Sequence, residues 1–510
     1  MDSPHEFVEK VPSLCPECGE PAPAVIFERE GKIYQRSTCD AHAESAALIF
    51  SDSGLYRKLN AWNEVVFGKN GHAVAECGNR SENPPTLAVI DITNRCNFQC
   101  PLCFAEATDH RDYYFLPVEK IRSMLASLLE DGPVPCAHVQ FSGGEPTLHP
   151  EFPRIVRMAR EMGFTHVQVA TNGSRFVDPG YASLCEEAGL HTLYLQFDGM
   201  NDEVYRKLRG QPLLDKKIRI VENIERGNTR IVLVPTIAAS VNVDQIGPIF
   251  GFALAHSRHI TGISIQPAAD IGRVQVDGGP APAPFNLADL ALEFSRQTGL
   301  TRTPEDWSPL NAVSMITRGL SRMRGDALPH PACDAHCSLG TYFYIDERNR
   351  PTCVNRFFDL DRFLRNIGRV SVGGGLLAQP LSRLLQLGLL ADCFLKDQAP
   401  EGMTFQRLLR GLEGWEDKSA GRGPDWDKAG FNGMFVAGMH FMDARNYNRR
   451  RLKRCIIQYV TANRELVPFC SYNAGPRLRT EEEMARGNRH LAAEPFRTVP
   501  GADCVELCGH

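Results

Sequence analysis

Three closely spaced cysteines are the residues best suited to chemistry in this chain of 510 residues. Cys96, Cys100 and Cys103 come directly after an apolar run, Leu87 to Ile92. Soft thiolates suit iron–sulfur clusters, and three of them on a loop leaving a strand can hold three irons of a [4Fe–4S] cluster. No fourth cysteine follows nearby, so one iron would keep an open position at which chemistry can occur. A structural zinc knuckle and three unconnected cysteines are the alternatives.

Glycines and polar residues recur where later apolar segments end. The second segment ends in Gly143, Gly144, Glu145 and Pro146, and paired glycines let a ligand approach the backbone closely. The polar residues at the ends of the next segments are Thr171, Asn172, Gln196, Asp198 and Gln266. The alternative is that the Asn-Gly and Asp-Gly pairs among them are ordinary turns or helix caps.

The CxxxCxxC motif, followed one segment later by Gly-Gly-Glu-Pro, resembles the radical S-adenosylmethionine (SAM) superfamily. The resemblance implies that the open iron binds SAM and that one electron from the cluster cleaves SAM to methionine and a 5′-deoxyadenosyl radical. It also implies a SAM site whose residues are Gly143, Gly144, Glu145 and Pro146 at the methionine end, Thr171, Asn172, Gln196 and Asp198 near the ribose and carboxylate, and Gln266 near the adenine. A low-potential electron donor of the ferredoxin or flavodoxin type is the implied partner.

Apolar strands alternate with amphipathic helical patterns from Leu87 to about Pro267. The expected strands are Leu87–Thr93, His138–Ser142, His166–Thr171, Thr192–Phe197, Arg230–Ile237 and Gly262–Gln266. The expected helices between them include Pro117–Glu130 and Glu151–Met162. Strict alternation implies parallel strands joined by helical crossovers. We therefore expect an α/β fold with a partial, TIM-like (β/α)6 barrel, whose active site lies at the carboxyl ends of the strands.

A second group of metal-binding residue types lies near the N-terminus. Cys15 and Cys18 precede Cys39 and His42, with a strand-like segment, Ala24 to Tyr34, between the two pairs. This spacing suits a tetrahedral metal, either Zn²⁺ or a rubredoxin-like Fe, and ligand type does not choose between them. The alternative is a chance pair of short spacings.

The same patterns divide the chain into four parts. We expect a metal-knuckle domain at 1–51, a helix (Gly54–Phe67) and linker at 52–85, the partial barrel at 86–285, and an auxiliary cluster and substrate region at 286–510. Pro84-Pro85 and a Gly/Pro/Ala-rich stretch at 268–285 mark two of the boundaries.

Further cysteines in the C-terminal part suggest an auxiliary [4Fe–4S] cluster. Cys333 and Cys337 lie beside a glycine-bearing segment and a strand, and Cys455 and Cys470 are candidates to complete the ligand set. In a chain with seventeen cysteines and no export signal, metal binding explains more of them than disulfides do. Cys136 and Cys185 lie in apolar patterns and are expected to be core residues.

Two other C-terminal segments have two interpretations each. Leu376–Leu390 is leucine-rich and is either a core helix or the wall of an apolar substrate channel or a membrane contact. Arg445–Arg454 is basic and either holds phosphate groups or forms a solvated helix face.

Composition limits the functional classes. The chain is 43% hydrophobic and 23% charged, with a formal net charge of −5, which is typical of a globular protein and argues against a nucleic-acid partner. No apolar run approaches the length of a membrane span. We expect a cytoplasmic protein, with peripheral contact to a membrane as a variant of that expectation.

Across most of its length the chain resembles the tetraether lipid synthases and their hydroxymethyl-dihydropterin methyltransferase-like relatives. The resemblance rests on the Cys15–His42 knuckle, the run Thr93–Ala105, and the segments 337–341, 454–457 and 468–473. It implies radical attack on an unactivated C–H bond of a lipid chain that leads to carbon–carbon coupling. Methyl transfer to a pterin-like or other heterocycle is the first alternative, so the implied substrate is either a lipid or a small molecule. A non-enzymatic iron–sulfur electron carrier or scaffold is the second.

Overall fold

The computed structural model describes eight stretches of the chain, namely residues 6–68, 83–107, 113–130, 135–275, 284–324, 330–367, 378–413 and 431–474. Three cysteines of the sequence, Cys77, Cys504 and Cys508, lie outside these described residues, as do the first two residues of the leucine-rich segment.

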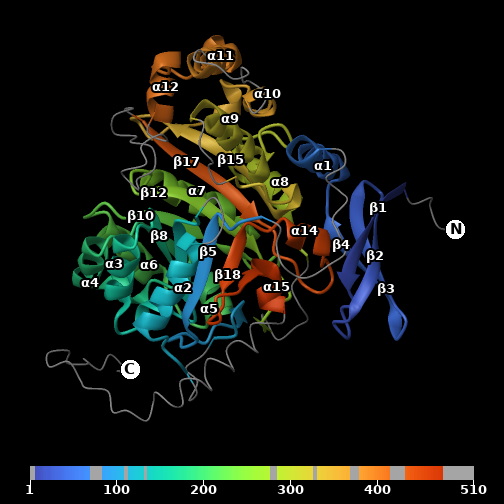
Figure 1. Cartoon of the computed structure of the whole chain (residues 1–510), viewed down its shortest axis with the longest axis vertical. Helices are drawn as coiled ribbons and strands as arrows, with labels where there is room; N and C mark the ends of the chain where they lie inside the picture. The colour runs from blue at the N-terminus through green and yellow to red at the C-terminus, as the bar shows by residue number, and fades with distance from the viewer. Residues whose placement is uncertain are drawn as a thin grey trace.

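The N-terminal unit is an antiparallel sheet in which neighbouring strands follow one another along the chain. Its strands are β1 (Glu6–Leu14), β2 (Pro21–Arg29), β3 (Lys32–Cys39) and β4 (His42–Phe50). The strand expected over Ala24–Tyr34 is instead two strands of a hairpin, because the chain turns at Glu30 and Gly31, both with positive φ. Figure 1 shows this sheet standing beside the main body of the molecule.

Helix α1 (Ser53–Phe67) connects the N-terminal sheet to the rest of the chain. Its first turn is capped because the backbone N–H of Leu55 donates to the Asp52 carboxylate at 2.8 Å. Leu59 and Trp62 are fully buried on its inner face. The helix matches the one expected over Gly54–Phe67.

Six parallel strands form the predicted barrel sheet. They are β5 (Leu87–Thr93), β7 (His138–Gly143), β8 (His166–Thr171), β9 (Thr192–Gln196), β10 (Arg230–Val234) and β12 (Ile260–Pro267). They lie side by side in chain order and pair in parallel. The strand expected over Arg230–Ile237 breaks at Pro235, which has no N–H for the ladder. Its last residues form the short strand β11 (Thr236–Ile237).

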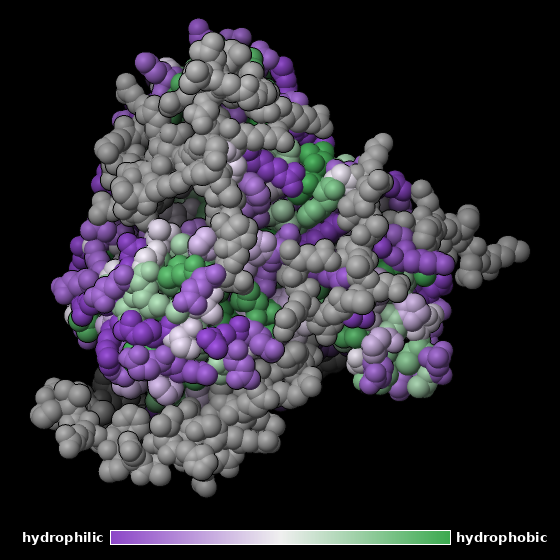
Figure 2. Space-filling view, viewed as in Figure 1, coloured by the Kyte–Doolittle hydropathy of each residue, from purple (hydrophilic) through white to green (hydrophobic). Residues whose placement is uncertain are grey.

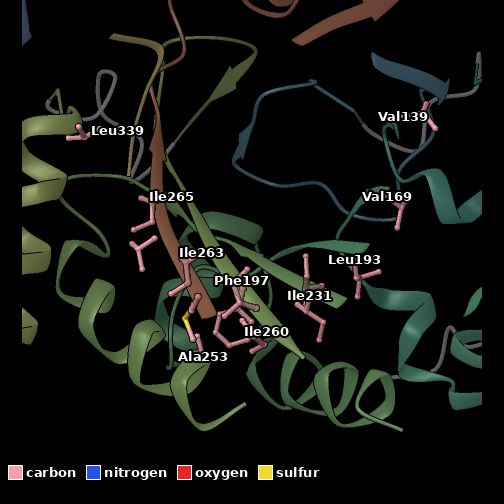
Figure 3. Close-up of a cluster of buried hydrophobic side chains, with 14 of the residues drawn as sticks. Val139, Val169, Leu193, Phe197, Ile231, Ala253, Ile260, Ile263, Ile265 and Leu339 are labelled. Carbon is pink, nitrogen blue, oxygen red and sulfur yellow. The ribbon is translucent and has the colours of Figure 1, made fainter. Parts of the chain in front are cut away.

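The crossover helices cover the outer face of this sheet. They are α2 (Val118–Glu130), α3 (Phe152–Glu161), α4 (Pro179–Glu187), α5 (Asp202–Arg209), α6 (Leu214–Ile224) and α7 (Ile246–Ala255). Alternate residues of the strands, such as Val139, Leu193 and Ile263, are buried in this layer together with Ala253 of α7 (Figure 3). Cys136 and Cys185 belong to the same core, as expected. The intervening residues of each strand are left to line the inside of the barrel.

The C-terminal part contributes further strands to the same sheet. Its elements are α8 (Leu287–Thr298), β14 (Ser308–Pro309), α9 (Ser314–Arg324), β15 (Ser338–Ile345), β16 (Pro351–Cys353), α10 (Leu360–Ile367), α11 (Ala378–Cys393), α12 (Phe405–Glu413), β17 (Asn432–Met439), α14 (Arg449–Lys453), β18 (Ile457–Val460), β19 (Leu466–Pro468) and α15 (Phe469–Ala474). β17 pairs in parallel with β12, and β18 pairs in parallel with β5. Figure 1 shows both strands beside the barrel strands. The parts expected at 86–285 and 286–510 therefore share one sheet, because the exposed edges of a partial barrel need partners.

The leucine-rich helix α11 is a core element over only part of its described side chains, because Leu389 and Leu390 pack against the hydrophobic core and Cys393 is buried in it, whereas three other leucines are exposed. Leu384, Leu385 and Leu387 of α11 are 65%, 47% and 39% exposed. Elsewhere, the coloured part of the face in Figure 2 interleaves hydrophilic and hydrophobic residues. Among the described residues, the helices are too short or too polar to cross a bilayer.

Candidate active site and metal centres

The loop carrying Cys96, Cys100 and Cys103 follows β5 and is fixed by contacts from distant segments. Its end forms β6 (Leu102–Cys103), which pairs with β13 (Arg273–Val274). Arg273 Nη1 donates to the backbone oxygen of Cys100 at 2.9 Å. The three cysteines all line a cavity of about 250 Å³ at the carboxyl ends of the strands, which we call the cluster cavity.

The glycine pair brings two backbone segments into contact. Gly144 N–H donates to Thr93 O at 2.8 Å, and Glu145 N–H donates to Arg95 O at 2.7 Å. A Cβ at Gly143 would lie 2.0 Å from Thr93 O, so only glycine permits this approach. We expected the paired glycines to admit a ligand close to the backbone, but the group that approaches them is the backbone of the cysteine loop. Both glycines also line the cluster cavity.

The cluster cavity collects most of the residues expected at the SAM site. Those lining it are Cys96, Cys100, Cys103, Gly143, Gly144, Glu145, Thr171, Asn172, Gln196 and Gln266. Pro146 and Asp198 are not among the lining residues. Pro146 instead begins a buried helical turn, Pro146–Leu148, that is capped by the Glu145 side chain.

Glu145 joins the ends of β7 and β8. Its carboxylate accepts hydrogen bonds from the Thr171 hydroxyl and from the backbone N–H of Asn172, both at 2.7 Å. It also accepts from the hydroxyl of Thr147 at 2.5 Å and its N–H at 3.1 Å. The side chain is buried, and this burial raises the pKa of the carboxyl despite the four donors.

Asn172 connects the end of β8 to the cysteine loop. Its Nδ2 donates to Asn97 Oδ1 at 2.9 Å. Its Oδ1 accepts from the N–H of Ser174 at 2.9 Å. The residue therefore caps a turn, as the alternative reading of the Asn-Gly pair had it, and it also lines the cavity.

Asp198 lies behind the cavity and holds Arg209, a residue that no sequence motif marks as functional. The carboxylate is fully buried and forms a two-pronged ion pair with Arg209, with Nε–Oδ2 and Nη2–Oδ1 distances of 2.6 and 2.9 Å. Arg209 lines the cavity and donates to the backbone oxygen of Leu102 at 3.0 Å. The expectation that Asp198 faces SAM is therefore corrected. The Asp198 carboxylate instead holds the guanidinium of Arg209 in place.

Lys217 of α6 is a second charged residue that the sequence analysis missed. It is 1% exposed, and its Nζ donates to Asn172 O at 2.6 Å and Gln196 Oε1 at 2.7 Å. Burial lowers its pKa to about 7. In sequence both Lys217 and Arg209 look like ordinary charged positions of exposed helices, so no local signal marks them.

The donor set of the cysteine loop fits an iron–sulfur cluster. Burial is the main cause that raises the pKa of the Cys96 and Cys100 thiols, with neighbouring thiols adding to it. Such groups become thiolates only if a cation offsets their charge. Because all three cysteines line the open cluster cavity, a cluster that they held would leave a coordination position facing that cavity.

The N-terminal residues converge as metal ligands should. Ligand atoms of Cys15, Cys18, Cys39 and His42 all lie within 4.8 Å of one another. The Cys39 Sγ–His42 Nδ1 distance is 3.5 Å, and the backbone N–H of Cys18 is the main cause that lowers the pKa of Cys15 to about 7. These distances fit one tetrahedral ion, in which ligands about 2.3 Å from the metal lie close together.

The four C-terminal cysteines gather at a second place but are more widely spaced. Burial is the main cause that raises the pKa of Cys333, and the neighbouring thiols of Cys337 and Cys455 add to it. Burial likewise raises the pKa of Cys455, with the thiols of Cys470 and Cys337 adding to it. Among the residues described, no three of these sulfurs come within 4.8 Å of one another. Wider spacing suits a cluster of several irons better than a single ion. Cys353 and Cys393 are buried in the hydrophobic core.

Aromatic residues from both ends of the chain form one wall of the cluster cavity. Its lining includes Phe104, Phe441, Tyr459 and Phe469. The Phe469 ring lies 5.4 Å from Phe104, 5.0 Å from Phe441 and 5.3 Å from Tyr459, centroid to centroid. We call these four residues the aromatic wall. Three of them come from the C-terminal part, which therefore helps to shape the site.

Comparison with known proteins agrees with this arrangement. Residues 90–250 match the model of the radical SAM superfamily. Residues 7–51 match the HMPTM N-terminal zinc ribbon domain. The N-terminal sheet with its four converged ligands is thus a zinc ribbon by family, which supports a metal site there.

Two curated relatives illustrate the range of similarity. A 7,8-dihydro-6-hydroxymethylpterin dimethyltransferase of Methanocaldococcus jannaschii is 33% identical over 94% of this chain and 96% of its own. An Fe-coproporphyrin III synthase of Methanosarcina barkeri is 28% identical over 52% of this chain and 59% of its own. Among solved structures, a methylornithine synthase matches at 18% identity and a TM-score of 0.34, over 49% of this chain and 71% of that one. The full-length relative, the family model and the cysteine loop at the barrel mouth agree: this chain is an enzyme that belongs to the radical SAM superfamily.

Proposed function

We propose that this enzyme methylates a flat, pterin-like heterocycle, using SAM both as methyl donor and as source of the radical. The relative that is similar over nearly the full length is named for methyl transfer to a pterin. This supports methyl transfer, the first alternative drawn from the sequence, rather than lipid coupling, which was the main interpretation.

The aromatic wall is the observation that carries the proposal. A pterin is a flat ring system, and offset stacking of aromatic rings adds about 0.5–1.5 kcal/mol beyond the burial of area. The wall stands at the cavity that also holds the three cysteines and the residues proposed for SAM. A ring bound against Phe469 or Phe441 would therefore lie at the reactive end of the site.

The chain's own residues would position the reactants. We propose that Cys96, Cys100 and Cys103 hold the cluster, and that Gly144, Glu145, Asn172 and Gln196 shape the SAM side. When bound, the cluster and SAM supply a radical that takes hydrogen from a C–H bond. Replacing that hydrogen with a methyl group consumes two SAM and two electrons from a low-potential donor, and yields S-adenosylhomocysteine, methionine and 5′-deoxyadenosine.

The test uses SAM with a fully deuterated methyl group and 7,8-dihydro-6-hydroxymethylpterin, with reduced, cluster-reconstituted protein. We expect a pterin product that carries deuterated methyl, detected by mass spectrometry, and a weaker yield with Phe469→Leu. A pterin that stays unlabelled while SAM is cleaved would contradict the proposal.

A second candidate, attack on an apolar chain, is favoured by a different cavity. A cavity of about 440 Å³, which we call the apolar chamber, is lined by strands β15 and β17 and by helices α10–α12, including the residues Tyr342, Phe435, Phe363, Leu364 and Leu390. Ser264 lines it as well, and it accepts a hydrogen bond at 2.6 Å from Tyr194, which lines the cluster cavity. The chamber thus neighbours the cluster cavity, and the exposed leucines of α11 lie on the helix that supplies Leu390.

The two candidates predict opposite responses of two variants. Leu390→Lys places a charge at the apolar chamber and should abolish hydrogen transfer from a deuterated isoprenoid chain into 5′-deoxyadenosine, while pterin labelling persists. Phe469→Leu should weaken pterin labelling more than it weakens deuterium transfer from the chain. Transfer from the chain in the unchanged protein, together with no pterin labelling, would make the apolar chain the substrate.

A further inference from the structure

Arg451 of α14 is a buried cation that contacts a cysteine sulfur. Its side chain is 6% exposed. Nη2 lies 3.6 Å from Cys337 Sγ and donates to the backbone oxygen of His440 at 2.9 Å. Cys337, Asp334 and Cys470 are the groups whose charges interact with it most strongly.

The carboxylate of Asp334, whose charge raises the pKa of Arg451, is already engaged by other groups. Asp334 pairs with Arg454 at 2.9 Å and with His336 at 3.0 Å. Within the described residues, Arg451 has no carboxylate oxygen within 4.0 Å, and its Nε has no hydrogen-bond acceptor. The interpretation of Arg445–Arg454 as a solvated helix face is therefore wrong for Arg451 and Arg454, which are both buried.

A buried guanidinium without a carboxylate partner needs another anion. Taking a charge out of water costs several kcal/mol, which a counter-ion must offset. Four thiolates around an iron–sulfur cluster carry net negative charge, and Cys337 is one of the four cysteines gathered here. The geometry points to the auxiliary cluster as the counter-ion of Arg451.

We propose that Arg451, by its charge and its N–H···S contact to Cys337, raises the reduction potential of the auxiliary cluster. Reduction adds one negative charge, so a nearby cation favours the reduced state, and hydrogen bonds to cluster sulfurs act in the same direction. The role is one of positioning charge, not of contacting substrate.

The position of the cluster makes its potential relevant to the site. Cys470 follows Phe469 of the aromatic wall, and the N–H of Met442, next to Phe441, donates to Cys470 Sγ at 3.5 Å. The cluster would thus lie directly behind the wall. The charge of the cluster, which changes with its oxidation state, would therefore act on the substrate site.

The test measures potential, which a purely structural role would not move. In the full chain with Cys96, Cys100 and Cys103 all changed to serine, the auxiliary cluster should be the only iron–sulfur cluster that remains, and an EPR-monitored redox titration of the signal of the reduced cluster reports its midpoint. We expect Arg451→Met to shift the midpoint to a more negative value and Arg451→Lys to shift it less. Arg450→Met is the matched control on the same helix, because Arg450 pairs with Glu9 at 2.6 Å instead, and it should leave the midpoint unchanged.

Two results would overturn the proposal. One is an assembled cluster in Arg451→Met with the midpoint of the parent, and the other is no iron–sulfur cluster in the parent with the three serines, whether or not the N-terminal site holds iron. If the methionine variant assembles no cluster, Arg451→Lys decides: a cluster retained near the parent midpoint supports the charge, and a lost cluster refutes it. No substrate enters this experiment, so failure of the proposed methylation would not affect its result.

Discussion

Replacing Glu145 should loosen the junction between β7 and β8 in a graded way. Glu145→Ala removes the acceptor for the Thr171 hydroxyl and the Asn172 N–H, which both lie 2.7 Å from the carboxylate. Glu145→Gln keeps one acceptor oxygen and loses the other. Glu161→Gln, at an exposed position near the end of α3, is the matched control.

The size of the effect follows from the donors that lose their acceptor. Each buried donor left unsatisfied costs about 1–3 kcal/mol. Two such donors at the end of β8 give about 4 kcal/mol for the alanine variant, and one gives about 2 kcal/mol for glutamine. At 1.4 kcal/mol for each factor of ten, local opening should rise about a thousandfold in the first and roughly 30-fold in the second.

Hydrogen exchange measured by mass spectrometry on peptides covering residues 166–174 reads this opening directly. We expect the fastest exchange in Glu145→Ala, slower exchange in Glu145→Gln, and the slowest exchange in the unchanged protein and the Glu161→Gln control. Isothermal titration with SAM should show weakened affinity in the same order, because Thr171 and Asn172 line the cavity. Equal protection in all four proteins would refute the role assigned to Glu145.

Three further predictions concern stability and metal content. Burial is the main cause that lowers the pKa of His166 to about 4 and that of His191 to about 3, from an ordinary value of 6.5. The folded protein therefore keeps both side chains neutral. The stability that they contribute is complete above about pH 6.5 and is lost as the pH falls from 6.5 toward the two lowered pKa values. Urea unfolding should lose roughly 2 kcal/mol per histidine between pH 6.5 and pH 5, and a slope that His166→Gln leaves unchanged would contradict this. Cys39→Ser should remove one zinc or iron per chain in elemental analysis and leave the remaining iron in place; an unchanged metal content would exclude the N-terminal site. Arg209→Met leaves the Asp198 carboxylate buried without its partner and should destabilise the protein by about 3–5 kcal/mol, whereas a double change with Asp198→Asn should cost less in the same denaturation assay; equal costs would argue against the ion pair.

Local sequence patterns were sufficient for the elements whose partners are close in the chain. The strand expected at His166–Thr171 forms with those bounds, since alternating apolar residues determine which face packs against the helices. Patterns failed where a backbone detail decided the outcome. Pro235 splits one strand, and positive φ at Glu30 and Gly31 makes a hairpin of another.

Long-range contacts account for what the sequence could not show. The pairing of β18 with β5 joins residues more than 350 positions apart, and nothing local to either strand encodes it. Arg209 and Lys217 became part of the candidate site because the fold buries them beneath it, whereas lysine and arginine in helices are usually exposed. The opposite happened on part of α11, where the leucine-rich pattern suggested a core helix: Leu384, Leu385 and Leu387 are exposed, while Leu389 and Leu390 pack against the core.

The central claim is that the cysteine loop holds the cluster that cleaves SAM. Its most direct test is the amount of 5′-deoxyadenosine formed when reduced, cluster-reconstituted protein is incubated with SAM. We expect 5′-deoxyadenosine from the unchanged protein and none from Cys100→Ser. Continued formation in that variant, or none in the unchanged protein with its iron in place, would contradict the account.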